Sequence, residues 1–372
     1  MKKNLCAVAV LAAMSGAAAA ANVELYGIVD MAMSVANRTY VSKSSDTTLA
    51  LKSGQQNSSR WGIRGSEDIG GGLKVGFSLE NGFNADTGTL ANDGRMFGRD
   101  ARLFVEGEQF GLLSVGRMGP IVGGNGPYAR FGIDVNPFSC DWGDVGGTLQ
   151  LMGLGYAFVD NAIAYTTPKF GGFDASLQYS FGTDVTKFSG TATEGKSSVE
   201  RMAAGALRYK NDRFMVVAGI EEINQAQPAA DAKKLDDSIS YNLATSYDAG
   251  FAKFYAYGQY FQSYAAAAKV TVFGIPSGVD GWGLILGSEI PAFSGKVKLS
   301  LGYADFKGAE LSEQTMKTWQ AAAGYVYPLS KRTSIYTGFG WINSSYSSAY
   351  EAAHPAAQEN VREFLLGVTH KF

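Results

Sequence analysis

Residues 361–372 read VREFLLGVTHKF, and this stretch decides the fold class of the chain. Counting back from the terminal Phe372, alternate positions hold His370, Val368, Leu366 and Phe364, and the positions between them are mostly small or polar. A repeat of two is the side-chain period of a β-strand, so the stretch predicts a strand with one apolar face. Two settings stay open for it: a half-buried strand of a soluble sandwich, or the last strand of a membrane barrel.

The other end of the chain has the composition of an export signal. Lys2 and Lys3 precede an apolar stretch from Leu5 to Met14, and small residues follow as far as Ala21. This order is typical of a secretory signal peptide, and the apolar part is too short to span a bilayer. We therefore assign residues 1–21 to a signal peptide and residues 22–372 to a single mature domain.

Overall composition favours the membrane barrel. Removal of two lysines with the signal would change the formal charge from −2 to −4, which does not suit a nucleic-acid partner. Mean hydropathy is only −0.05, although 12% of residues are aromatic. Lipid-facing and lumen-facing residues alternate in a membrane barrel, so their hydropathies cancel in this way.

Two kinds of connection alternate along the chain. Seven short ones, rich in residues that form tight turns, are predicted at 66–72, 106–111, 167–172, 209–214, 247–252, 291–295 and 327–333. Eight long ones are predicted at 34–58, 84–94, 119–153, 183–198, 223–237, 265–278, 306–316 and 344–360. These fifteen connections join sixteen strands. Short periplasmic turns, long extracellular loops and an even strand number predict an all-β antiparallel transmembrane barrel of about 16 strands.

Charged residues fall on one face of several predicted strands. Arg60 and Arg64 share a face opposite Trp61, and Arg102 shares a face with Glu106. An arginine that faces lipid at the bilayer midplane costs about 2–4 kcal/mol, so these side chains are expected to face water inside the barrel. A barrel of about 16 strands is wide enough to hold a channel.

Several segments of the sequence resemble segments of one protein family. The run SRWGIRGSEDIGGGLKVGFSLENGF (59–83) resembles the strand-turn-strand segment of Gram-negative general diffusion porins of the betaproteobacterial type. MFGRDARLFVEGEQFGLLSVGRM (96–118) and AIAYTTPKFGGFDASLQYSFG (162–182) resemble later segments in the same order. The resemblance implies an outer-membrane homotrimer, surrounded by lipid, that passes ions and small hydrophilic solutes passively.

The resemblance also implies where the pore narrows. The connection at 119–153 is the third long loop, which folds into the barrel in this family. Family arginines on the opposing wall carry over to Arg60, Arg99 and Arg117, although strand parity admits the last two only if the strand breaks near Gly98 and Gly116. With the two arginines expected inside from parity, the predicted basic wall is Arg60, Arg64, Arg99, Arg102 and Arg117. The predicted acidic loop group is Asp134, Asp141 and Asp144.

One departure concerns the strand that begins near residue 159. The family often has a further constriction arginine there, whereas this chain has Phe158, Val159 and Asp160. The resulting pore is expected to be less anion-selective than its relatives, unless Arg130 in the loop compensates.

Other functions are less well supported by the residues. Serine hydrolysis needs a histidine base, and the two histidines, His354 and His370, fall in an external loop and on an outward face. With Cys140 they show no metal-ligand spacing, and no cofactor motif is present. A substrate-specific outer-membrane channel is the main alternative, and a closed adhesin is the alternative that transports nothing.

Overall fold

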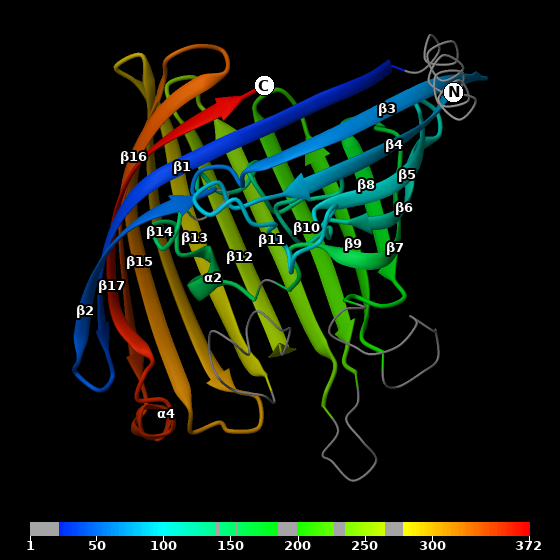
Figure 1. The fold of residues 1–372 in the computed structure, drawn as a ribbon. Coiled ribbons are helices and arrows are strands. Elements are labelled where there is room, and N and C mark those ends of the chain that lie inside the picture. Colours follow the sequence, from blue (N-terminus) through cyan, green and yellow to red (C-terminus); the bar gives the residue numbers. More distant parts are fainter. Residues whose placement is uncertain (1–21, 139–141, 154, 185–198, 227–234, 265–277) are drawn as a thin grey trace, which may run out of the picture.

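The computed structural model describes residues 22–138, 142–153, 155–184, 199–226, 235–264 and 278–372. In this part of the chain, 17 strand segments form one antiparallel sheet that closes into a barrel (Figure 1). Closure comes from β1 (Asn22–Tyr40), which pairs with β17 (Gln358–Lys371) from Ile28 opposite Lys371 to Tyr40 opposite Gln358. The predicted all-β transmembrane barrel is thus confirmed. The predicted signal peptide, residues 1–21, lies outside the described residues.

The remaining strands continue the sheet around the barrel, and the short helices α2 and α4 lie in the connections between them. They are β2 (Ser45–Ser53), β3 (Arg60–Gly70), β4 (Leu73–Gly82), β5 (Asp100–Gly107), β6 (Gly111–Met118), α2 (Thr148–Leu151), β7 (Val159–Thr166), β8 (Phe173–Ser180), β9 (Arg201–Lys210), β10 (Phe214–Asn224), β11 (Ser238–Asp248), β12 (Lys253–Tyr264), β13 (Val279–Ala292), β14 (Gly295–Gly308), β15 (Thr315–Pro328), β16 (Thr333–Tyr346) and α4 (Ser348–Ala353). Among the described residues, no helix is both long enough and apolar enough to cross a membrane.

The 17 segments make a barrel of 16 strands, because β2 and β3 are two parts of one strand. Both pair with β1, β2 along Met31–Thr39 and β3 along Asn22–Ile28. The prediction of a long connection at 34–58 is therefore wrong, since β1 runs to Tyr40 and β2 begins at Ser45. In this region the inward Ser34 and Ala36 are small and the alternate positions include the polar Asn37 and Thr39, so the strand lacks a clear apolar face in the sequence.

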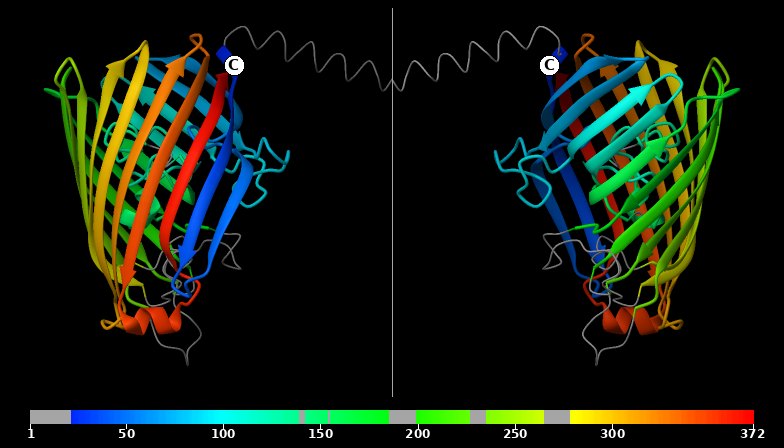
Figure 2. Two further views of the ribbon diagram at one scale, coloured as in Figure 1. Left: turned by 90° about the vertical axis from the view of Figure 1, so that its left-hand side faces the viewer. Right: turned by 90° about the vertical axis from the view of Figure 1, so that its right-hand side faces the viewer.

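The two ends of the barrel carry different connections. Figures 1 and 2 show the end of β17, the start of β1 and the short turn from β15 to β16 at one end, and α4 with the connection from β14 to β15 at the other. The last strand has the predicted faces: Phe364, Leu366 and Val368 are 48, 49 and 46% exposed on the outside, whereas Glu363 and Leu365 are fully buried inside. An apolar outer wall and a polar or small inner wall are what a lipid-embedded barrel requires.

The connection between β6 and β7 folds into the barrel and provides its core, which confirms the prediction for the third long loop. Val135, Phe138, Trp142 and Val145 are at most 1% exposed, and the ring of Trp142 lies 5.1 Å from that of Tyr336 on β16. The inner wall makes room by means of glycine. A Cβ atom on Gly340 of β16 would lie only 2.4 Å from the Cα of Val145, so a larger residue there would displace the loop.

Candidate functional site: the pore constriction

A cavity of about 1010 Å³ remains between this loop and one wall of the barrel. The wall side comes from β1, β3, β4 and β5, and the loop side is uncharged, consisting of Gly124, Asn125, Gly126, Pro127 and Ile133. Every charged residue of the lining therefore lies on the wall. They are the arginines Arg60, Arg64, Arg99 and Arg102 and the acids Glu24, Glu80, Asp100 and Glu106.

Each of the four arginines is paired with a carboxylate of the same wall. Glu80 holds two of them, with Nε of Arg99 at 2.6 Å and Nε of Arg60 at 3.5 Å. Arg64 lies 2.7 Å from Glu24, and Arg102 lies 3.0 Å from Asp100. Four arginines and four acids give this lining no formal net charge, so its field comes from alternating charges along one wall.

Aromatic rings lie beneath the arginines. The guanidinium carbon of Arg64 is 4.9 Å from the ring centre of Tyr26, and that of Arg99 is 5.0 Å from the ring centre of Phe158. Arg102 lies 4.9 Å from the ring centre of Phe104. An arginine over an aromatic face is attracted by the ring quadrupole, which limits its motion without neutralising its charge.

The strand breaks predicted near Gly98 and Gly116, which would let Arg99 and Arg117 face the lumen, are present. Arg99 lies just before β5 begins, and the register between β6 and β7 shifts between Gly116 and Met118, with Gly116 at φ 132°. Arg99 lines the cavity, whereas Arg117 does not. The bulge turns Arg117 toward the side of the cavity, where its guanidinium lies 5.7 Å from the ring centre of Phe158.

Asp160 at the start of β7 explains the position of Arg117. The Asp160 carboxylate lies 2.5 Å from Nη1 of Arg117 and 2.7 Å from Nη1 of Arg95, which belongs to the connection between β4 and β5. Arg95 also reaches Asp184 at 2.6 Å. The residue that replaces a family arginine thus binds two other arginines beside the cavity. Sequence analysis missed Arg95 because its partners are 65 and 89 positions away.

The two described loop aspartates, which were expected opposite the arginines, are not among the residues that line this cavity. Asp134 lies 2.8 Å from Nζ of Lys210 on β9, and Asp144 lies 2.7 Å from Nη2 of Arg38 on β1. Each aspartate is drawn to a wall cation that the loop sequence does not reveal. Asp141 lies outside the described residues. The carboxylates that face the arginines are those of the wall itself.

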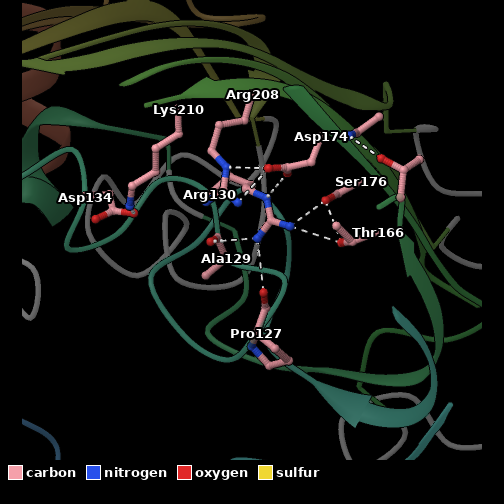
Figure 3. Close-up of polar contacts among 11 residues, drawn as sticks. Pro127, Ala129, Arg130, Asp134, Thr166, Asp174, Ser176, Arg208 and Lys210 are labelled. Carbon is pink, nitrogen blue, oxygen red and sulfur yellow. Dashed lines mark hydrogen bonds and ion pairs between the residues drawn. The ribbon is translucent and has the colours of Figure 1, made fainter. Parts of the chain in front are cut away.

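Arg130 does not serve as an extra constriction arginine. It is 6% exposed and attaches the loop to the barrel wall (Figure 3). Its guanidinium donates to Thr166 Oγ1 at 3.0 Å and to Ser176 Oγ at 2.8 Å, and Nε is 3.6 Å from Asp174. Asp174 is shared with Arg208, whose Nη2 lies at 2.8 Å. The loop is thereby fixed to β7, β8 and β9.

Comparisons with known proteins agree with this architecture. The family described as Gram-negative porin matches residues 7–347. An outer membrane porin protein of Bordetella pertussis is 29% identical over the full length of both chains, and outer membrane porin protein 32 of Delftia acidovorans is 30% identical over 94% of this chain and 91% of its own.

Solved structures show the same fold. An anion-selective porin from Comamonas acidovorans has a TM-score of 0.67 at 24% identity, with 95% of this chain and all of that chain covered. The trimer form of OmpT from Vibrio cholerae has a TM-score of 0.60 at 15% identity, with 95% of this chain and all of that chain covered. The matched family, the closed barrel and the loop that narrows it lead to one conclusion: the chain belongs to the Gram-negative porin family.

Proposed function

We propose that ions and small hydrophilic solutes cross this outer-membrane porin through the cavity lined by Arg60, Arg64, Arg99 and Arg102. The observation that supports this proposal is a cavity of about 1010 Å³ between the third loop and a wall that carries both arginines and carboxylates. A polar, wet passage of this kind passes solutes by size and charge. Residues 1–21 are proposed to be the export signal, and the roles of Asp134 and Asp144 are proposed to be anchoring of the loop.

General diffusion is favoured over a substrate-specific channel. A specific channel would need free aromatic faces along the path, and Tyr26, Phe104 and Phe158 each lie against an arginine instead. The balanced lining also predicts weak ion selectivity. One uncompensated charge about 7 Å away in water would stabilise one sign of ion and destabilise the other by about 0.6 kcal/mol each, roughly a sevenfold preference, and the balanced lining has no such excess charge.

The purified protein should therefore form large, weakly selective channels in a planar bilayer. Under a salt gradient, we expect a permeability ratio of cation to anion within about threefold of one, because the lining has no formal net charge. The measurement is single-channel conductance together with reversal potential. Absence of conductance would contradict the diffusion function, and small steps blocked by one solute would favour the specific channel.

Asp160→Asn should make the pore more anion-selective. The change leaves the charges of Arg95 and Arg117 less compensated beside the cavity. An added charge at about 7 Å stabilises an anion and destabilises a cation by about 0.6 kcal/mol each, which shifts the permeability ratio by up to roughly sevenfold. Reversal potential under a salt gradient measures this shift. Asp305→Asn, which removes a carboxylate away from the cavity, should leave the ratio unchanged. An unaltered ratio in Asp160→Asn would mean that Arg117 does not act on the permeating ion.

We also propose that the protein is a homotrimer whose contacts include the wall at β5 and β6. These strands have eight residues each, whereas a membrane-spanning strand needs about 9–11, so this part of the wall requires a cover within the membrane. On the outer faces of these two strands, Leu103 and Val115 are 60 and 46% exposed. The fold neighbour described as a trimer form supports the proposal. Leu103→Lys with Val115→Lys should reduce the trimer fraction in mild detergent, measured by light scattering.

A further inference from the structure

Six residues between β2 and β3 leave the barrel wall. In the ladder with β1, Ser53 pairs with Met31 and Arg60 pairs with Ile28, so residues 54–59 lie opposite only two residues of β1. A flat ladder has no room for the excess, and Gly54 begins the departure at φ +70°. We call residues 54–59 (GQQNSS) the strap. The strap is the reason why the second strand of the barrel is divided into β2 and β3.

The strap is held inside the barrel by the carboxylate of Asp30. Asp30 is fully buried on the inward face of β1, and its oxygens accept hydrogen bonds from the backbone amides of Gln55 at 2.9 Å and Asn57 at 3.2 Å. The same carboxylate accepts bonds from the hydroxyl of Tyr336 at 2.7 Å and from the hydroxyl of Thr369. Both hydroxyls come from buried positions on the inward faces of β16 and β17, so the strap lies on the lumen side of the wall.

The strap contacts both parts of the constriction. Its Ser58 carbonyl accepts a hydrogen bond from Nη1 of Arg60 at 3.0 Å, which fixes one edge of a cavity-lining arginine. Asn57 itself lines the cavity. On the other side, a Cβ atom on Gly143 of the third loop would lie 2.8 Å from Oε1 of Gln55, so strap and loop are in contact. The narrow region is thus bordered by two chain segments that enter the lumen.

We propose that the strap is a second constriction element of the pore, that Asn57 faces the passing solute, and that Asp30 is its positioning residue. The inference rests on the proposed diffusion function, because it assigns part of the same passage. The strap narrows the path directly through Asn57, and it affects selectivity by orienting Arg60. A carboxylate suits this position because an ionised carboxylate only accepts hydrogen bonds, and the amides and hydroxyls around Asp30 all donate them.

A thiol probe tests whether Asn57 faces the passage. In a Cys140→Ser background, Asn57→Cys in the open channel is exposed to a charged methanethiosulfonate reagent; the thiolate attacks its sulfur, forming a mixed disulfide and releasing methanesulfinate. Asn57 is held through its backbone amide, so the change leaves the strap bonds intact. We expect a stepwise loss of single-channel conductance on addition of the reagent. Leu49→Cys, on the exposed outer face of β2, is the matched control and should show no loss.

Asp30→Asn tests the positioning role. The asparagine places an amide donor among donors, so we expect a mobile strap, a higher mean conductance and more current noise than in the native channel. Asp46→Asn is the matched control, since Asp46 lies at the exposed start of β2, and it should behave as the native protein does. The Asn57→Cys experiment does not depend on this variant folding.

The outcomes separate the strap from the pore itself. Channels of ordinary conductance that the reagent does not affect in Asn57→Cys would overturn the assignment of the strap while the diffusion function stands. A folded Asp30→Asn channel with native conductance and noise would overturn the positioning role. If the native protein forms no channels, the diffusion function fails, and the inference fails with it.

Discussion

Arg60→Ala combined with Arg99→Ala is expected to convert a weakly selective channel into a cation-selective one. The lining then holds two more acids than arginines, and Glu80 loses both of its arginine partners while keeping the hydrogen bond from Tyr26. Two charges, each worth about 0.6 kcal/mol at about 7 Å in water, stabilise a cation by about 1.2 kcal/mol and destabilise an anion by as much, so the unscreened cation-to-anion ratio rises by roughly fiftyfold, and less as salt screens the charges. Reversal potential under a salt gradient measures the change, and the sign follows because removal of positive charge attracts cations and repels anions.

Two comparisons make this result specific. Arg213→Ala removes one arginine charge from the turn between β9 and β10, outside the cavity, and should leave the reversal potential unchanged. Adding Glu80→Gln to the double variant restores one unit of the lost charge and should reverse about half of the shift. Since Arg99 is only 7% exposed, folding of each variant is checked first by its mobility on gels before and after heating. A double variant that folds and keeps native selectivity would exclude these arginines from the ion path.

Arg130→Ala should release the third loop from the wall and make the channel unstable under voltage. The variant loses the bonds to Thr166 and Ser176, so the half-buried hydroxyl of Thr166 and the buried hydroxyl of Ser176 each have one partner fewer. Hydrogen bonds of charged groups contribute about 1.5–3 kcal/mol, so loss of these contacts weakens loop attachment by an amount of that order. Asp174 keeps Arg208 at 2.8 Å, which limits the damage to the barrel itself.

The measurement is the voltage at which half of the channels close, together with current noise in the open state. We expect closure at lower voltage and greater noise in Arg130→Ala, and an intermediate effect in Arg130→Lys, which keeps the charge but cannot reach several acceptors at once. Arg332→Ala, in the turn before β16, provides the control. A native closing voltage in a folded Arg130→Ala protein would show that Arg130 does not restrain the loop.

The alternation of apolar and polar residues along single strands made the faces of those strands predictable from the sequence. In β17, the outward Phe364 and Leu366 and the inward Glu363 follow from a period of two, because neighbouring side chains on a strand must point to opposite faces. The same argument placed Arg60, Arg64 and Arg102 inside, and all three line the cavity. The resemblance added Arg99 and the third loop, and the observed strand breaks explain why parity alone could not include Arg99 and Arg117.

The contacts that the sequence did not predict join residues that are far apart in the chain. Asp144 was expected to face the arginines, yet it pairs with Arg38, 106 positions away. Asp160 forms an ion pair with Arg117, 43 positions away. Such pairs depend on which strands and loops meet inside the barrel, and no local pattern contains that information. The prediction at 34–58 failed for a related reason, because small inward residues on β1 are packed by a loop from elsewhere in the chain.

The amino-acid sequence by itself determined the barrel, the approximate number of strands and the faces of its strands, because period-two alternation and turn residues act over a few neighbouring positions. Only the tertiary structure decided how the passage is built. The balance of charge on one wall, the capture of Arg117 by Asp160 and the strap held by Asp30 all arise where distant segments meet in the closed barrel. Ion pairs and hydrogen bonds form between whichever groups closure brings within reach, and closure is a property of the whole chain.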